Sequence, residues 1–299
     1  MPQARITVFG GTGFLGREIV RELVESGHLV RLVARAPTPP AWALESDQLE
    51  MAIADIRSDA DVAMVLEDAD AVLNAVSLYR ETSTTGFEEI HVEGAGRLAM
   101  LAREAGIERL VHVSGIGASN DSPSAYVRAR ARGEEAVLDA MPRATLLRPS
   151  VLFGRDDAFL AALDTLTRLP VVPLFGRGET RLQPVHVIDV ARAAARLLAG
   201  PEQPRRLFEL GGPEVMSYRE IVELVMAYRQ RQRRLLTVPF WVWRTLASLL
   251  SPLPDAPLTR DQVILMRDEN QVGDGVGTFA DLGLAPRSLR DALPDCLDD

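Results

Sequence analysis

The sequence has few of the residues that build disulfides, metal clusters or membrane spans. It contains one cysteine, Cys296, among 299 residues, so no internal disulfide can form. None of the four histidines is spaced from another histidine or from the cysteine in the way that metal ligands usually are. No apolar run approaches the ~20 residues of a membrane span, and no secretory signal pattern is visible at the start. We therefore expect a cytoplasmic protein that holds no metal.

An excess of basic residues is also missing. The chain has 42 acidic and 33 basic residues, which gives a formal net charge of -9. General nucleic-acid binding needs a basic face, so this class of function is not expected. Hydrophobic residues make up 47% of the chain, a share that is ordinary for a globular enzyme-like protein. The length suffices for a large core with a smaller appended lobe.

Short apolar runs alternate with helical stretches over residues 5–155. The runs are Ile6–Phe9, Leu29–Val33, Leu49–Ala54, Ala71–Ala75, Leu110–Val113 and Thr145–Leu147, and the helical stretches are 14–25, 59–67, 87–105 and 124–140. Buried parallel strands have such continuous apolar runs, and strand–helix alternation favours a parallel sheet with helices on both faces. The pattern predicts an α/β fold of the Rossmann type, a doubly wound parallel sheet.

The pattern changes after Gly154, where prolines become frequent. Helical stretches remain at 158–168, 189–199, 217–230 and 241–250, with short strands such as Val171–Leu174 and Leu207–Leu210 between them. We expect a dinucleotide-binding domain at 1–154 and a smaller mixed lobe at 155–299, which would bind a substrate or a partner. The segment near 183–199 is expected to return to the first domain.

A glycine-rich turn follows the first apolar run. The segment Gly10-Gly11-Thr12-Gly13-Phe14-Leu15-Gly16 reads as GxGxxG from Gly11 and as GxxGxxG from Gly10. One glycine of this motif allows a tight turn, another lets the backbone approach a pyrophosphate, and the last lets the helix pack close to the strand. Because the turn joins a strand to a helix inside a βαβ unit, it predicts a dinucleotide site. A glycine-rich structural turn is the alternative.

The end of the second predicted strand distinguishes the two nicotinamide cofactors. NAD-binding folds usually place an acidic residue there, but this sequence has Arg35. A guanidinium fits a 2′-phosphate through its charge and its paired donors, so we expect NADP(H), with NAD(H) as the alternative. Arg35 as a solvated surface residue is the simpler explanation, and Arg17 is a weaker second candidate. After the third strand, Asp55 can accept from the adenine amino group or cap the next helix, for which Ser58 is the better cap.

With these residues placed, the chain resembles the extended, atypical short-chain dehydrogenase/reductase superfamily, a group with relatives of the NAD-dependent epimerase/dehydratase kind. It is more narrowly similar to bacterial relatives of the NAD(P)H-binding accessory subunit of respiratory complex I. The resemblance rests on GGTGFLGR near the start, HVSGIGAS at 112–119, YVRARARGEEAV at 126–137, RPSVLFGRDDAF at 148–159, LPVVPLFGRGETRLQPVHVIDVA at 169–191 and PLTRDQVILMRDEN at 257–270.

The resemblance implies a set of contacts to the nicotinamide dinucleotide. They would come from Gly10, Thr12, Gly13, Phe14, Leu15, Gly16, Arg35, Asp55, Ala75 and Val76, with Tyr126 and Arg130 at the ribose. The turn Pro149-Ser150-Val151 would lie beside the nicotinamide, with Pro149 and Val151 in contact with it.

The resemblance also implies a catalytic set, from which this sequence departs. The superfamily uses a tyrosine, a lysine four residues later, and a serine or threonine at the end of the fifth strand. Tyr126 is present, but position 130 is Arg, and the pattern places the hydroxyl at Ile116, two residues after Ser114. Arg130 keeps the charge but cannot act as a neutral proton relay. We take Tyr126, Arg130 and Ser114 as the catalytic candidates, with a merely packed Tyr126 as the alternative.

Residues 229–250 form a candidate docking surface. A basic run, Arg-Gln-Arg-Gln-Arg-Arg at 229–234, precedes an apolar stretch at 240–250 with two tryptophans. On a helix, Phe240, Trp243, Ala247 and Leu250 would share one stripe, and Trp241, Arg244 and Ser248 another. Such a segment can bind an anionic membrane surface or a membrane-bound respiratory complex, which would place the protein at the periphery of the inner membrane. A lobe helix packed on a substrate cleft is the alternative.

Three functions follow from these features. The first is an NADP(H)-binding atypical dehydrogenase-like protein with weak or no turnover, which serves the assembly or stability of a respiratory NADH:quinone oxidoreductase complex. The second is an active NADP(H)-dependent reductase, dehydrogenase or sugar-nucleotide-type epimerase with Tyr126 as proton donor. The third is a regulator whose bound NADP(H) senses redox state.

Overall fold

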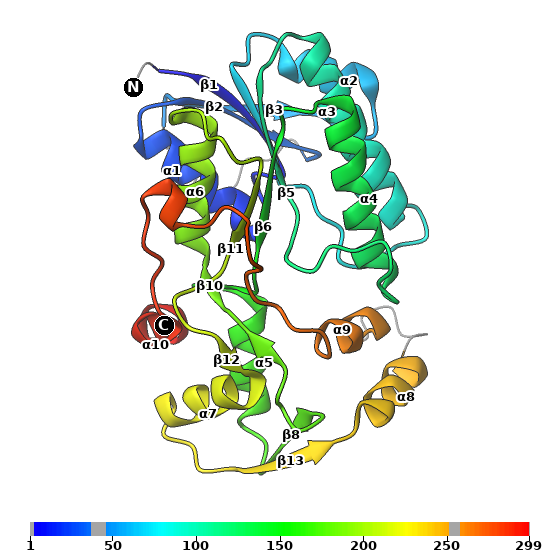
Figure 1. Ribbon diagram of the computed structural model, residues 1–299, viewed down its shortest axis with the longest axis vertical. Coiled ribbons are helices and arrows are strands. Elements are labelled where there is room, and N and C mark those ends of the chain that lie inside the picture. The colour runs from blue at the N-terminus through cyan, green and yellow to red at the C-terminus, as the bar shows by residue number, and fades with distance from the viewer. Residues whose placement is uncertain (1–2, 37–45, 251–257, 299) are drawn as a thin grey trace.

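The computed structural model describes residues 3–36, 46–250 and 258–298, and its centre is a seven-stranded sheet (Figure 1). The strands are β1 (Arg5–Phe9), β2 (Leu29–Ala34), β3 (Leu49–Ile53), β4 (Ala71–Asn74), β5 (Arg109–Val113), β6 (Thr145–Pro149) and β11 (Leu207–Leu210). Their order is β11-β6-β5-β4-β1-β2-β3, and every pairing is parallel. The order reverses between β1 and β4, the position at which sheets of this kind bind nucleotides. The expected α/β fold with a doubly wound parallel sheet is confirmed.

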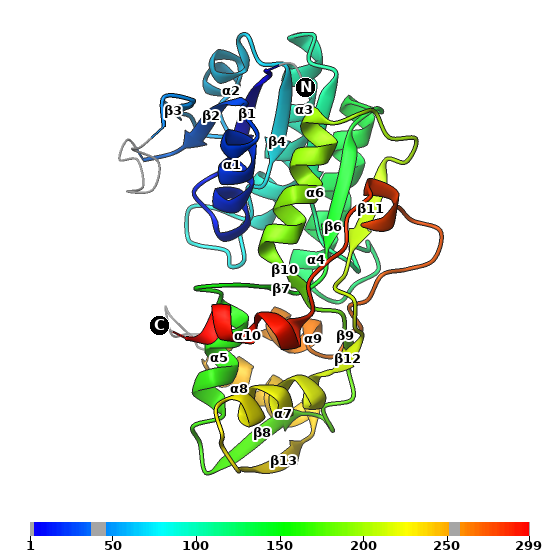
Figure 2. The same cartoon turned by 90° about the vertical axis from the view of Figure 1, so that its left-hand side faces the viewer.

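Helices cover both faces of this sheet. On one face lie α1 (Phe14–Glu25) and α6 (Val187–Ala199); on the other lie α2 (Asp59–Leu66), α3 (Ala95–Glu104) and α4 (Ala125–Ala140), with the π-helical segment η2 (Glu88–Gly94) before α3 (Figures 1 and 2). Each face has its own apolar core. Leu15, Ile19 and Leu23 of α1 are buried in the first core because their helical spacing puts them on one side.

A smaller lobe lies beyond the sheet and has a third apolar core. Its helices are α5 (Ala158–Leu166), α7 (Tyr218–Tyr228), α8 (Phe240–Leu250), α9 (Arg260–Leu265) and α10 (Leu289–Leu297). Its strands form three pairs: β7 (Leu152–Phe153) with β10 (Val185–His186), β9 (Arg181–Leu182) with β12 (Met216–Ser217), and β8 (Val171–Phe175) with β13 (Arg234–Val238). No helix in the described parts of the chain is long and apolar enough to cross a membrane.

The chain passes between sheet and lobe more often than the sequence indicates. Leu207–Leu210, which we expected in the lobe, is instead the edge strand β11 and pairs in parallel with β6. A strand of three apolar residues and one glutamate does not reveal its pairing partner, and the parallel neighbour lies some sixty residues earlier in the chain. The short helix η3 (Ala280–Leu282) also returns to the sheet, where Phe279 and Leu282 join the core of α1 and α6.

Candidate functional site

The glycine turn between β1 and α1 brings the backbones of two strands together. Gly10 has a φ of +77°, and a Cβ atom there would lie 2.6 Å from the carbonyl carbon and oxygen of Ala75. A Cβ atom on Gly16 would lie 2.1 Å from the carbonyl oxygen of Gly10. Only glycine fits at both positions. The turn therefore lies directly against Ala75 and Val76 at the end of β4, as a pyrophosphate-binding loop requires.

The first turn of α1 leaves its amide groups free for an anion. Gly13 is the N-cap and has no side chain to cap the helix, and no acidic residue lies in the first turn. Thr12 and Gly13 are exposed, Leu15 is buried, and Phe14 is half-buried. A helix N-terminus with free N–H groups attracts phosphate. Arg17 turns away from the end of β2, because it donates to the carbonyl of Arg155 at 3.2 Å and pairs with acids.

Arg35 and Asp55 lie near each other at the carboxyl ends of β2 and β3. Arg35 is exposed, and its charge is one of the causes that lower the pKa of Asp55. The largest cause is Arg57, whose Nε and Nη2 donate to the Asp55 carboxylate at 3.0 and 2.6 Å. Ser58 caps α2, so the capping alternative for Asp55 is wrong. The contact between Arg57 and Asp55 was not expected from the sequence, because an arginine in a turn does not reveal its partner.

The strand ends beneath the crevice are buried and uncharged. Asn74 accepts from the amide of Val76 at 3.1 Å, and its amide nitrogen lies 3.2 Å from Nδ1 of His112. Burial, and then the charge of Arg130, lower the pKa of His112 to about 3. The imidazole is therefore neutral at physiological pH, and Asn74 holds the backbone of Val76 in place.

Helix α4 positions Tyr126 and Arg130 as neighbours. Ser124 caps the helix by accepting from the amide of Val127, and it donates to Asp261 of α9 at 2.5 Å. One turn apart on the same face, Arg130 donates from Nη1 to the Tyr126 hydroxyl at 2.5 Å. This pair is the one that the spacing predicts.

Aromatic rings surround Tyr126. The ring centroids of Tyr79, Phe87 and His91 lie 5.8, 5.6 and 5.5 Å from that of Tyr126, which is buried. His91 comes from the π-helical segment η2, and its Nε2 lies 3.0 Å from the Leu78 carbonyl. Burial lowers the pKa of His91 to about 4. Three apolar or neutral rings thus hold Tyr126 in place, and the sequence alone did not indicate them.

Ser114 and Ile116 follow β5, next to this pair. Ser114 is 2% exposed, and its Oγ is the one buried side-chain polar atom in the described residues without a hydrogen-bond partner. The Ile116 amide donates to the Pro149 carbonyl at 3.2 Å, so the loop is joined to the turn after β6. A Cβ atom on the intervening Gly115 would lie 3.3 Å from the Arg130 guanidinium carbon. The structure therefore brings Ser114, Arg130 and Pro149 into one neighbourhood.

Asn270 joins three segments at this end of the site, and sequence reasoning did not single it out. Its Oδ1 accepts from the Ser150 hydroxyl at 2.6 Å and from the Val151 amide at 3.1 Å. Its Nδ2 donates to the Ile116 carbonyl at 3.3 Å. Asn270 thereby fixes the turn that we expect beside the nicotinamide. Its only sequence signal is its place at the end of the PLTRDQVILMRDEN stretch.

All 33 basic residues of the chain are arginine, and the chain contains no lysine. Position 130 therefore follows a chain-wide preference, and the exchange of lysine for arginine there is not a signal peculiar to the site. Its chemical consequence stands, since a guanidinium stays protonated where an ammonium can lose its proton.

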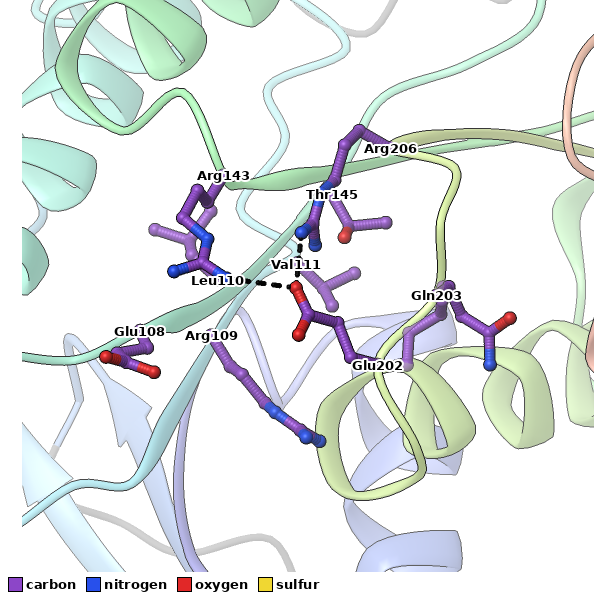
Figure 3. A pocket seen from close by; sticks show the side chains of 10 residues that line it. Glu108, Arg109, Leu110, Val111, Arg143, Thr145, Glu202, Gln203 and Arg206 are labelled. Atoms are coloured by element: carbon purple, nitrogen blue, oxygen red, sulfur yellow. Dashed lines mark hydrogen bonds and ion pairs between the residues drawn. The ribbon is translucent and has the colours of Figure 1, made fainter.

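A separate pocket lies at the opposite, amino edge of the sheet (Figure 3). Glu202 occupies it and pairs with Arg143 at 3.2 Å and Arg206 at 2.6 Å. Arg109 donates to the carbonyls of Leu198 and Gly200 at the C-terminal end of α6. Its arginines are thus bound to Glu202 or to a helix end, so we assign the pocket no ligand. The described residues contain no group of three or more side chains that could hold a metal ion.

Comparison with known proteins gives consistent matches. A family model described as NAD dependent epimerase/dehydratase family matches residues 6–211. The chain is 34% identical over 300 residues to "NADH dehydrogenase [ubiquinone] 1 alpha subcomplex subunit 9, mitochondrial" of Arabidopsis thaliana, covering 95% of this chain and 75% of the relative. The mouse protein of the same name is 30% identical over 95% of this chain and 77% of its own length. A ceramide reductase of Caulobacter vibrioides is 33% identical over 65% of this chain and 60% of its own length.

Solved structures share the fold at low sequence identity. The crystal structure of gox2253 has a TM-score of 0.72 at 23% identity and covers 99% of this chain and 97% of its own. MoeE5 in complex with UDP-glucose and NAD has a TM-score of 0.70 at 21% identity, covering 97% and 96%.

Proposed function

The chain belongs to the NAD dependent epimerase/dehydratase family, and we propose that it holds NADP(H) with weak or no turnover and serves the assembly or stability of a respiratory NADH:quinone oxidoreductase complex. The resemblance seen in the sequence is confirmed by the family match and by the complex I relatives. Membership in this family also supports the coarser expectation of a nicotinamide dinucleotide, without distinguishing NADP from NAD.

The binding half of the proposal is supported by the glycine turn and the uncapped start of α1. The contact between Gly10 and Ala75 leaves a backbone cradle for the pyrophosphate, and the adenosine would extend toward Asp55. At the other end, the turn held by Asn270 would contact the nicotinamide. No metal is needed for any of these contacts.

The choice of NADP(H) over NAD(H) is supported by Arg35. No acidic residue stands at the end of β2 to accept from a ribose 2′-hydroxyl. Arg35 is exposed there, and no hydrogen bond or ion pair holds it within the described residues. Titration of the nucleotide-free chain with NADPH, NADP⁺, NADH and NAD⁺ tests the choice. The proposal requires the two phosphorylated forms to bind more tightly, and equal affinities would contradict it.

The observation that carries weak turnover is Ile116 at the position of the superfamily's hydroxyl donor. An isoleucine cannot polarise a carbonyl, and loss of such a donor typically costs on the order of a hundredfold in rate or more. Arg130 adds to this effect, because its guanidinium binds the Tyr126 hydroxyl and cannot pass on a proton. The Tyr126–Arg130 pair is therefore suited to orient a ribose rather than to drive proton transfer.

The respiratory role is supported by relatives that align along nearly the whole chain. Proteins named as NADH dehydrogenase subunits match 95% of it, so the lobe is included and not only the nucleotide-binding fold. A deletion strain tests this role. We expect its membranes to have less assembled NADH:quinone oxidoreductase, and the wild-type gene to restore it. Normal amounts and activity of the complex in the deletion strain would contradict the role.

An active NADP(H)-dependent reductase is the second candidate, and the unpartnered Ser114 hydroxyl favours it. A buried Oγ without a partner is available to bind a substrate oxygen. The ceramide reductase relative makes a carbonyl substrate worth screening. If the wild type reduces a substrate, Tyr126→Phe should lower kcat, and Ser114→Ala should do the same. Full activity in both variants would exclude this mechanism.

A further inference from the structure

The segment from Arg229 to Leu250 has an unusual charge for this protein. It contains five arginines and no acidic residue, although the whole chain has a net charge of -9. In the structure the segment comprises the turn after α7, strand β13 and helix α8. These elements lie at the end of the molecule's long axis that is farthest from the sheet (Figures 1 and 2). The local positive charge is thus concentrated at one tip.

One face of α8 is packed into the lobe. Phe175 of β8 stacks on Phe240 with ring centroids 6.4 Å apart and on Trp243 at 4.5 Å. The Trp243 indole nitrogen donates to the Leu174 carbonyl at 3.1 Å, and Ala247 is buried. These contacts account for the stripe that the sequence predicts on one side of the helix, and they fix its orientation.

The remaining surface of α8 is exposed and carries several large apolar side chains. Trp241 is 64% exposed, Leu249 72% and Leu246 40%. On the neighbouring strand β13, Leu236 is 52% exposed. A helix that needs only one apolar face for its own lobe usually has polar residues on the other. Several large apolar side chains on the free face of one short helix therefore mark a surface that contacts something else.

The arginines of the segment from Arg229 to Leu250 divide into two groups. Arg229 and Arg231 both bind the Asp164 carboxylate at 2.9 Å, so they hold the turn between α7 and β13 to α5. Arg233, Arg234 and Arg244 are exposed, and the described residues offer them no ion pair. Charges without an internal partner, at the same end of the molecule as exposed tryptophan and leucine (Figures 1 and 2), match an anionic, partly apolar surface.

We propose that this α8 surface, made of Trp241, Leu246, Leu249 and Leu236 with Arg233, Arg234 and Arg244, docks on an anionic phospholipid membrane. Tryptophan and leucine would enter the headgroup boundary while the arginines bind lipid phosphates. Helix α8 has 11 residues and is about 16 Å long, too short to cross a bilayer. The proposal concerns lipid only, so it does not depend on the proposed cofactor or on a role in a respiratory complex.

Flotation of the purified full chain with protein-free vesicles tests the proposal. Vesicles of phosphatidylcholine with phosphatidylglycerol should bind the chain at low salt, and vesicles of phosphatidylcholine alone should bind it far less. Binding should weaken as salt is added, because exposed charges are screened. Absence of binding to the anionic vesicles at low salt would overturn the proposal.

Two pairs of variants separate the charge from the apolar contact. Arg233→Gln/Arg234→Gln should weaken binding roughly 25-fold, about fivefold for each arginine near the surface. Arg103→Gln/Arg290→Gln, two exposed arginines in other helices, makes the same charge change and should have little effect.

Trp241→Ser/Leu249→Ser should weaken binding at least about tenfold. Its matched control is Met64→Ser/Met100→Ser, which removes exposed apolar side chains from α2 and α3. Equal losses in a variant and its control would contradict the assignment of this surface. If native membranes bind the chain and protein-free vesicles do not, a protein partner occupies the surface and the lipid proposal is wrong.

Discussion

Replacing Arg35 by aspartate should reverse the preference between the two nicotinamide cofactors. In the structure Arg35 is exposed at the end of β2 and close enough to influence Asp55 electrostatically. A charge-assisted hydrogen bond to a 2′-phosphate is worth about 1.5–3 kcal/mol, which corresponds to roughly 10- to 150-fold in affinity. Arg35→Asp removes this contact and adds repulsion, so NADPH should bind about a hundredfold more weakly or worse.

The same variant should leave binding of NADH unchanged or strengthen it. The pyrophosphate would still bind at the glycine turn, and an aspartate at position 35 can accept from the ribose 2′-hydroxyl. Isothermal titration with NADPH and NADH measures both affinities on the same preparation. Arg35→Gln separates the loss of the contact from the added repulsion, and Arg103→Asp controls for the change in net charge. NADPH affinity unchanged in Arg35→Asp would refute the assignment, as would equal weakening of both nucleotides.

Three other perturbations have expected outcomes. Gly16→Ala should abolish nucleotide binding and lower the free energy of unfolding by about 1–3 kcal/mol, because the new Cβ atom would lie 2.1 Å from the Gly10 carbonyl oxygen. Gly273→Ala, whose Cβ atom would have its nearest neighbour at 3.4 Å, should change neither property. Equal effects of the two variants in a denaturant titration would contradict this. Asn270→Ala should lower the free energy of unfolding by about 2 kcal/mol, because the Ser150 hydroxyl and the Val151 amide lose their hydrogen-bond acceptor. Asn270→Asp keeps an acceptor oxygen and should lower it less, and thermal unfolding measures both variants. His91 and His112 have pKa values of about 4 and 3, below the 6.5 of an unfolded chain, so the unfolded state binds more protons as pH falls. The free energy of unfolding should therefore drop by about 1.6 kcal/mol per histidine between pH 6.5 and 5, and a flat profile there would show that the imidazoles are not buried as described.

The sheet was predictable because its strands and turns carry local signals. Buried parallel strands are continuous apolar runs, and α1 begins after a glycine motif, so both could be read along the chain. The helix from Phe14 to Glu25 has the predicted bounds. Strand β11 was missed as part of the sheet, because strand pairing depends on residues distant in sequence and not on its own four residues.

The candidate site was predictable only where a short sequence motif requires particular residue types at fixed spacings. The glycine turn and the Tyr126–Arg130 spacing are of this kind, and the structure joins the second pair at 2.5 Å. Asn270 and Arg57 act through partners that are distant or conformation-dependent, so nothing in their own neighbourhoods marks them. The aromatic rings around Tyr126 come from residue 79 and from the segment 87–91, which meet helix α4 only in the folded chain.

The rate at which bound nucleotide exchanges tests the central claim most directly. We would purify the chain without added cofactor, identify the co-purifying nucleotide and its redox form by mass spectrometry, and follow its replacement by labelled nucleotide. A protein that holds its cofactor for structure should retain NADPH and exchange it over hours, whereas a reductase must release NADP⁺ and bind new NADPH in each turnover. An empty site that binds NADP⁺ and NADPH rapidly and reversibly would contradict the holding role and favour the reductase.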